Sequence, residues 1–138
     1  MTYLLLLPVL LVVLFALGVR LAPSDPARWH GDVPLAPARF EGGRIEVIAG
    51  DADTFRHLAE IAQATPRTQI LAGSATTGHL TLITRSKLWG FPDYTTMQLT
   101  EGQIALYARL RFGSSDTGVN SARLDDWLQR LEAVDQGR

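Results

Sequence analysis

The chain has 138 residues and a formal net charge of −1, because 13 Lys and Arg stand against 14 Asp and Glu. A surface that binds nucleic acid usually shows as a basic excess, so this balance predicts no nucleic acid partner. The sequence holds no cysteine. That excludes a disulfide framework, a thiolate metal site and a cysteine nucleophile.

The start of the chain is its most apolar part. Residues 1–19 carry no charged side chain, and Arg20 is the first. At about 1.5 Å per residue, a helix of this length approaches the roughly 30 Å thickness of the hydrocarbon core. We therefore predict that residues 1–20 form a transmembrane anchor in contact with the lipid bilayer, with Arg20 at the interface.

A cleaved secretory signal is the alternative interpretation of this stretch. The small-x-small pattern of residues 16–18 suits cleavage, but no Lys or Arg precedes the apolar run as it does in most signals. An uncleaved anchor is therefore favoured. The few basic residues after the anchor slightly favour a cytoplasmic C-terminal domain.

Residues 21–43 have the composition of a juxtamembrane linker. They hold four of the seven prolines, which favours an extended segment over a helix. Trp29, Leu35 and Phe40 would be costly to expose together. We expect part of this linker to pack on the domain, on the bilayer surface or on a partner.

Residues 44–138 are predicted to form one globular domain of the α+β class. Alternation of apolar residues predicts strands over residues 44–48, 68–72, 79–85, 94–99 and 103–112. A helix that Asp51 or Asp53 caps is expected to end at Thr65, and Asn120 is expected to cap the last helix. Short turns between successive strands predict an antiparallel sheet, with the two helices covering one face.

Several short segments resemble one known family. The most specific is residues 109–120, RLRFGSSDTGVN; the others are residues 65–68 (TPRT), 84–86 (TRS), 90–93 (GFPD) and 25–30 (DPARWH). Together they resemble the membrane-anchored members of the bacterial family called domain of unknown function 1499. The resemblance implies an export-side domain behind an anchor or signal, in bacteria and plastid-type membranes, and brings no established reaction. The basic residues beside the anchor give the opposite orientation, but we give the resemblance more weight. We therefore expect a single-pass protein of the bacterial inner membrane with a periplasmic domain.

The strongest motif offers two interpretations. Arg109 and Arg111 share one strand face and could grip a carboxylate or phosphate. Alternatively, Asp116 makes an Asx turn that Arg111 ties down, and Asn120 caps the following helix. The structural turn is favoured. The candidate residues for binding or for this turn are Arg67, Arg109, Arg111, Ser115, Asp116 and Asn120.

No catalytic pattern is recognisable in the sequence. The three histidines lack metal-ligand spacing, there is no Gly-x-Ser-x-Gly elbow, and the Gly73 to Gly78 loop lacks the lysine of a phosphate-binding loop. We therefore expect no enzyme activity, no cofactor and no metal. Apolar rings in the linker and in one turn are candidate partner contacts: Trp29, Trp89 and Phe91. Packing under the sheet is the alternative for the two rings in the turn, and it is slightly favoured.

Two functions are consistent with these features. The first is a non-catalytic, single-span accessory subunit of a larger integral membrane protein complex, which the resemblance suggests is respiratory or photosynthetic. The alternative is a membrane-anchored periplasmic binding module or enzyme for a lipid or anionic small molecule, with Arg109 and Arg111 as the ligand contacts.

Overall fold

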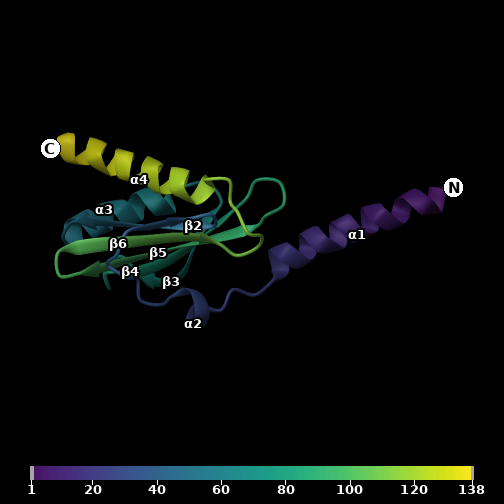
Figure 1. The fold of residues 1–138 in the computed structure, drawn as a ribbon, viewed down its shortest axis with the longest axis horizontal. Helices are drawn as coiled ribbons and strands as arrows, with labels where there is room; N and C mark the ends of the chain where they lie inside the picture. The colour runs from purple at the N-terminus through teal and green to yellow at the C-terminus, as the bar shows by residue number, and fades with distance from the viewer. Residues whose placement is uncertain (1, 138) are drawn as a thin grey trace.

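The computed structural model describes residues 2–137, and Figure 1 shows the order of its elements. They are α1 (Thr2–Leu21), α2 (Pro26–Trp29), β1 (Ala38–Phe40), β2 (Gly43–Ala49), α3 (Ala52–Gln63), β3 (Thr68–Ser74), β4 (His79–Arg85), β5 (Pro92–Thr100), β6 (Gln103–Leu110) and α4 (Val119–Gln136).

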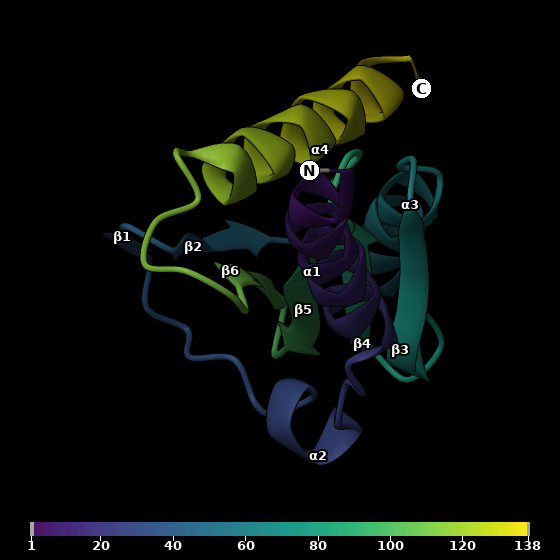
Figure 2. The same cartoon turned by 90° about the vertical axis from the view of Figure 1, so that its right-hand side faces the viewer.

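The strands form one antiparallel sheet in the order β1-β2-β6-β5-β4-β3. Helices α3 and α4 lie together over one face of it (Figure 2). Between them and the sheet is the hydrophobic core, which includes Phe55, Leu82, Leu106 and Trp127, all fully buried. The prediction of an α+β fold with an antiparallel sheet and two covering helices is confirmed.

Tight turns set the register of the central strands. At the β5–β6 turn both Glu101 (φ 48°) and Gly102 (φ 80°) have positive φ, as a two-residue hairpin with right-handed strand twist requires. The register pairs Thr100 with Gln103 across this turn. Side chains therefore alternate between the helix-covered face and the opposite face along each strand.

Helix α1 extends away from the domain (Figure 1). Its residues Tyr3–Leu21 are long and apolar enough to cross a membrane. Pro8 lies inside it, where a spanning helix tolerates proline. Most of its side chains are exposed, but Val19 is buried, so the end of α1 packs against the domain.

The segment between α1 and β2 contains two short elements that the sequence did not predict. Asp25 caps α2 by accepting from Ala27 N, with Pro26 at the first helical position. Strand β1 pairs with β2 and forms one edge of the sheet. Residues 22–33, here called the strap, cross the sheet on the face opposite α3 and α4 (Figure 2).

The start of α4 corrects the expected role of Asn120. Gly118, with φ 84°, precedes the helix, and no side chain of the capping residue bonds the helix there. Asn120 lies one residue inside α4 and is fully buried, whereas the preceding Val119 is 48% exposed. Asp116 performs the expected capping role, because its carboxylate accepts from the backbone N–H groups of Gly118 and Asn120.

Candidate functional site

Arg109 holds the strap on the sheet. Its guanidinium donates to the Trp29 carbonyl at 2.6 Å and to Thr96 Oγ1 at 3.0 Å. It also lies over the rings of Tyr107 and Trp29, 4.3 and 5.4 Å from the centroids. Burial lowers the pKa of Arg109, the nearby Tyr107 and Tyr94 acting in the opposite direction. These contacts engage the guanidinium within the protein.

Arg111 has a related role and does not tie down Asp116 as expected. It donates from Nη1 to the Pro23 carbonyl at 2.9 Å and to the Tyr94 hydroxyl at 3.0 Å. Ser24 shares that hydroxyl, with 2.6 Å between the two oxygens. The arginine pair of the predicted ligand site therefore donates to strap carbonyls and to side chains of β5.

Trp29, predicted as a partner contact, is instead part of this internal packing. Its side chain is 8% exposed. Its ring stacks on Tyr94, and the guanidiniums of Arg28 and Arg109 lie over it, 4.8 and 5.4 Å from the ring centroid. A ring stacked in this way is not available to a second protein.

Two histidines meet on the same face, which the sequence spacing did not predict. The rings of His30 and His79 stack with centroids 3.8 Å apart. His30 Nδ1 bonds Thr81 Oγ1 at 2.8 Å, and His79 Nε2 bonds the Gly31 carbonyl at 3.0 Å. Burial, and secondly the charge of His79, lower the pKa of His30. Among residues 2–137 no group of three or more His, Asp or Glu is arranged to hold a metal ion.

The contacts of Asp116 are those of a structural turn at the start of α4, as the favoured interpretation of the sequence predicted. Backbone N–H groups of Asn120 and Gly118 lower the pKa of the Asp116 carboxyl, although its desolvation opposes them. Ser115 is exposed and accepts from Thr117 N at 3.3 Å. The nearby Asp93 is paired with Arg123 at 3.3 Å. These groups hold the start of α4 in place.

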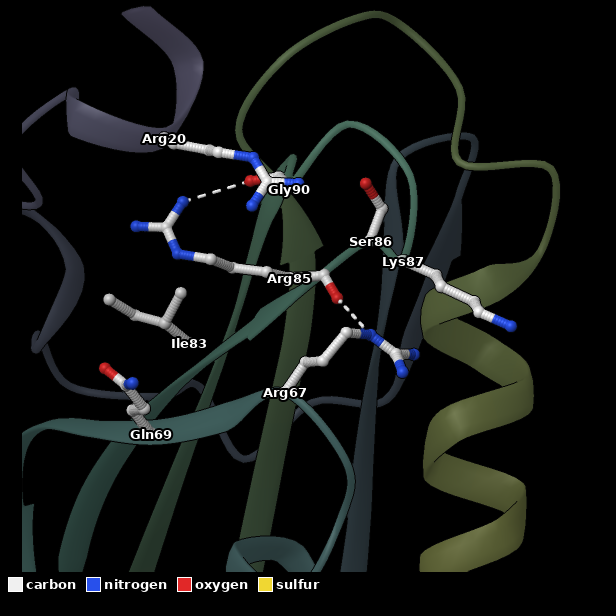
Figure 3. Close-up of a pocket in the computed structure, with 8 residues that line it drawn as sticks. All are labelled: Arg20, Arg67, Gln69, Ile83, Arg85, Ser86, Lys87 and Gly90. Carbon is white, nitrogen blue, oxygen red and sulfur yellow. Dashed lines mark hydrogen bonds between the residues drawn. The ribbon is translucent and has the colours of Figure 1, made fainter. Parts of the chain in front are cut away.

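Arg67 lies apart from the other predicted site residues, in a different cavity. It lies just before the edge strand β3 with φ 57°, and it donates from Nε to the Arg85 carbonyl at 3.0 Å. The cavity, here called the cationic pocket, has a volume of about 250 Å³ (Figure 3). Its lining residues are Arg20, Arg67, Gln69, Ile83, Arg85, Ser86, Lys87 and Gly90.

Two arginines of this pocket, Arg85 and Arg20, approach the backbone at Gly90. Arg85 donates from Nη1 to the Gly90 carbonyl at 3.0 Å, and Arg20 donates from Nη2 to the Leu88 carbonyl at 3.1 Å. A Cβ added at Gly90, which has φ 73°, would lie 2.8 Å from Arg20 Cγ. Only glycine accommodates this φ together with the close approach of an arginine.

The other two cations flank the opposite side. In Figure 3 the Arg67 and Lys87 side chains run to one side and Arg85 to the other. Three of the four cations are arginines: Arg20, Arg67 and Arg85. The hydrogen bonds within residues 2–137 use one nitrogen of each of these guanidiniums. Further N–H donors of each group are therefore available to a ligand.

The charged side chains that line the cationic pocket are all positive. Its described lining contains four cations and no carboxylate. Two like charges 4 Å apart repel by about 1 kcal/mol in water and by about 4 kcal/mol near a protein surface. An anion between them reverses the sign of these interactions. The pocket therefore favours a negatively charged group.

Sequence reasoning assigned only Arg67 of these cations to a site. The predicted β3–β4 hairpin contained a usable signal, because pairing of Thr68 with Thr84 brings Arg67 and Arg85 side by side. The third arginine, Arg20, reaches the pocket only because the end of α1 docks on the β4–β5 loop. No periodic pattern in the sequence encodes that docking.

Fold and site together define a small α+β domain behind one helix long enough to span a membrane, with a cationic pocket at their junction. The family described as "Protein of unknown function (DUF1499)" matches residues 30–131, well over half of the chain, so the chain belongs to this family. No curated protein and no solved structure matches the chain.

Proposed function

We propose that the protein is a membrane-anchored, non-catalytic binding module whose cationic pocket takes a phosphate group. One observation carries this proposal: four cations and no carboxylate line one cavity at the end of α1. The volume of about 250 Å³ lies below the roughly 300–1,000 Å³ of sites for drug-sized ligands. It suits a small anion or the head of a larger molecule.

Arginine is the side chain best fitted to this role. Its planar fork matches the oxygens of a phosphate or carboxylate and bonds them bidentately. Arg85 and Arg20 are already oriented by their bonds to backbone carbonyls. Less side-chain entropy is therefore lost when a ligand binds.

Two sources of the anionic group fit this chemistry, a lipid headgroup and a free anion. Arg20 lies in the last turn of α1. A cation at the end of a spanning helix lies near the lipid phosphates. The proposal thus covers a phosphate group, and the experiment below separates its sources.

Calorimetric titration of the full chain in a neutral detergent tests the proposal. Two probes are used in parallel: inorganic phosphate and dihexanoylphosphatidylglycerol, a soluble anionic lipid. The double variant Arg67→Gln/Lys87→Gln removes two pocket charges. Arg39→Gln, on the exposed edge strand β1 at the opposite edge of the sheet, is the matched control.

We expect the double variant to lose about tenfold or more in affinity, since a hydrogen bond to a charged group contributes about 1.5–3 kcal/mol. The control keeps wild-type affinity. Binding of both probes indicates a general phosphate site, and binding of the lipid alone indicates a headgroup site. The proposal is overturned if neither probe binds. It is also overturned if the control loses as much affinity as the double variant.

An accessory subunit of a larger membrane complex is the second candidate function. It is favoured by the exposed Leu88 and Trp89, which lie beside the end of α1 and extend its apolar surface. The family resemblance suggests a respiratory or photosynthetic partner. Purification in mild detergent through a C-terminal tag tests it: stoichiometric recovery of a membrane complex supports it, and recovery of the tagged chain alone contradicts it.

We further propose that the domain lies on the periplasmic side of the bacterial inner membrane. Because the chain has no cysteine, Thr76→Cys supplies a single thiol in the exposed β3–β4 turn. Labelling of this thiol in intact spheroplasts by a membrane-impermeant maleimide supports the proposal. Labelling only after lysis contradicts it.

A further inference from the structure

A group of large apolar side chains lies beside the end of α1. This group, here called the apolar tip, consists of Leu88 and Trp89 in the β4–β5 loop, Phe91 before β5, and Phe112 after β6. Leu88 is 75% exposed, Phe112 40% and Trp89 38%. A surface exposed to water rarely gathers so many large apolar side chains unless something covers them.

The apolar tip contacts α1 at two levels. Arg20, in the last turn of α1, donates to the Leu88 carbonyl. Phe91 meets the ring of Phe15 edge to face, with centroids 6.2 Å apart, and also contacts Phe112 at 6.2 Å. Figure 1 shows that both loops lie at the end of the sheet nearest α1.

These contacts fix the depth of the apolar tip relative to a bilayer. Phe15 lies five residues before Arg20 on α1, which places it about 7.5 Å closer to the N-terminal end of the helix, at about 1.5 Å per residue. If Arg20 lies at the lipid headgroups, Phe15 lies within the hydrocarbon. The ring of Phe91 then lies at the same depth, since it packs on Phe15.

We propose that the apolar tip inserts into the leaflet that the domain faces and so forms a second attachment beside α1. Trp89 lies at the interface, where indole rings are favoured. Lys87, next to the tip in sequence, lies at the level of the headgroups with Arg20. The attachment needs no ligand in the cationic pocket and therefore goes beyond the proposed function.

Two features favour lipid over a protein as the occupant. The apolar tip is continuous with α1, whose surroundings are lipid if it spans the membrane, so one medium covers both surfaces. Cations border the tip on the domain side, as they border membrane-inserted apolar segments that lie near anionic headgroups. A protein interface is retained below as an outcome of the test.

Nitroxide labels on single cysteines test the insertion directly. The labelled variants are Leu88→Cys and Phe112→Cys, each in the full chain in nanodiscs of phosphatidylcholine alone. Leu10→Cys in α1 is the control for the bilayer interior, and Thr76→Cys in the β3–β4 turn is the control for water. Collisions with oxygen report lipid, and collisions with a water-soluble nickel chelate report water.

We expect the labels at positions 88 and 112 to be at least several times more accessible to oxygen than to nickel, as at position 10. Accessibility like that of position 76 overturns the proposal. Shielding from both reagents indicates a protein contact and overturns it as well. If position 10 is also in water, α1 does not span and the proposal falls with it.

The natural fluorescence of the chain gives a second measurement without a cysteine. Of the three tryptophans, Trp29 and Trp127 are buried, so lipids brominated near the headgroup reach Trp89 first. We expect strong quenching of the wild type and little of Trp89→Phe; equal quenching overturns the proposal. Neutral lipid separates this result from anion binding, which is measured in detergent.

Discussion

The indole of Trp29 stacks on the phenol ring of Tyr94, with centroids 3.9 Å apart and planes 9° apart. Trp29 belongs to the strap and Tyr94 to β5, so this pair joins the segment after α1 to the centre of the sheet. Arg109 adds a hydrogen bond to the Trp29 carbonyl and a position over the same ring. The strap is thus an integral part of the domain.

Removal of the Arg109 guanidinium is expected to destabilise the domain. The variant Arg109→Met keeps the apolar stem but leaves the Trp29 carbonyl without this donor. We expect a loss of about 1–3 kcal/mol in the free energy of unfolding. Urea unfolding of the full chain in detergent, followed by far-UV circular dichroism, measures it. Arg39→Met, on the exposed strand β1, is the control. If Arg109→Met has the same free energy of unfolding as the wild type, the guanidinium does not stabilise the strap, and Arg109 is again a candidate ligand contact.

The strap is expected to loosen as the pH falls through the range of histidine. The pKa of His30 is lowered in the folded protein, so the unfolded chain binds more protons there. Its contribution to stability is present above the unfolded pKa of about 6.5 and is lost as the pH falls through the lower folded value. We expect the difference in melting temperature between wild type and His30→Gln to shrink from pH 7.5 to pH 5. A constant difference would contradict this assignment.

Gly90 is expected to be essential for the cationic pocket. In Gly90→Ala the new Cβ meets Arg20, and the left-handed backbone adds about 1–2 kcal/mol of strain. Gly102→Ala has a similar positive φ (80°) but open space around its Cβ, so it isolates the backbone cost. We expect phosphate affinity in calorimetry to fall in Gly90→Ala only. An equal fall in both variants would mean that the close approach of Arg20 is unimportant.

The carboxylate of Asp116 is expected to matter for stability and not for binding. It accepts from two backbone N–H groups at the start of α4, and loss of a capping side chain costs about 0.5–2 kcal/mol. Asp116→Ala should therefore lower the melting temperature while phosphate affinity is retained. Asp135→Ala, near the exposed end of α4, is the control and should change neither. Loss of phosphate binding in Asp116→Ala would place the ligand at this turn instead.

The sequence predicted the elements whose signals are local. The alternation that predicts β4 and β6 depends on neighbours within a few residues, and the structure confirms both strands. At the start of α4 the sequence offered two capping side chains, Asp116 and Asn120. Propensity alone favoured the residue nearest the helix, whereas the turn geometry selects Asp116.

The site was less predictable, because its residues meet through tertiary contacts. Arg109 lies in β6, but the strand ends at Leu110, two residues short of the prediction, so Arg111 lies just beyond it. Both side chains still reach the same face, where the strap takes their donors. The apolar side chains of the proline-rich segment predicted that part of it packs on the domain, the bilayer or a partner, but not that it lies across the sheet. The cationic pocket likewise depends on the docking of α1 at Gly90, which no sequence period encodes.

The most direct test of the central claim is nuclear magnetic resonance of the arginine side chains in the full chain, during titration with inorganic phosphate. Engagement of the cationic pocket predicts saturable shifts of the Nε–H signals of Arg20, Arg67 and Arg85, with those of Arg39 and Arg130 unmoved. Small, equal and unsaturated shifts at all arginines would contradict it, because they are the response to ionic strength alone.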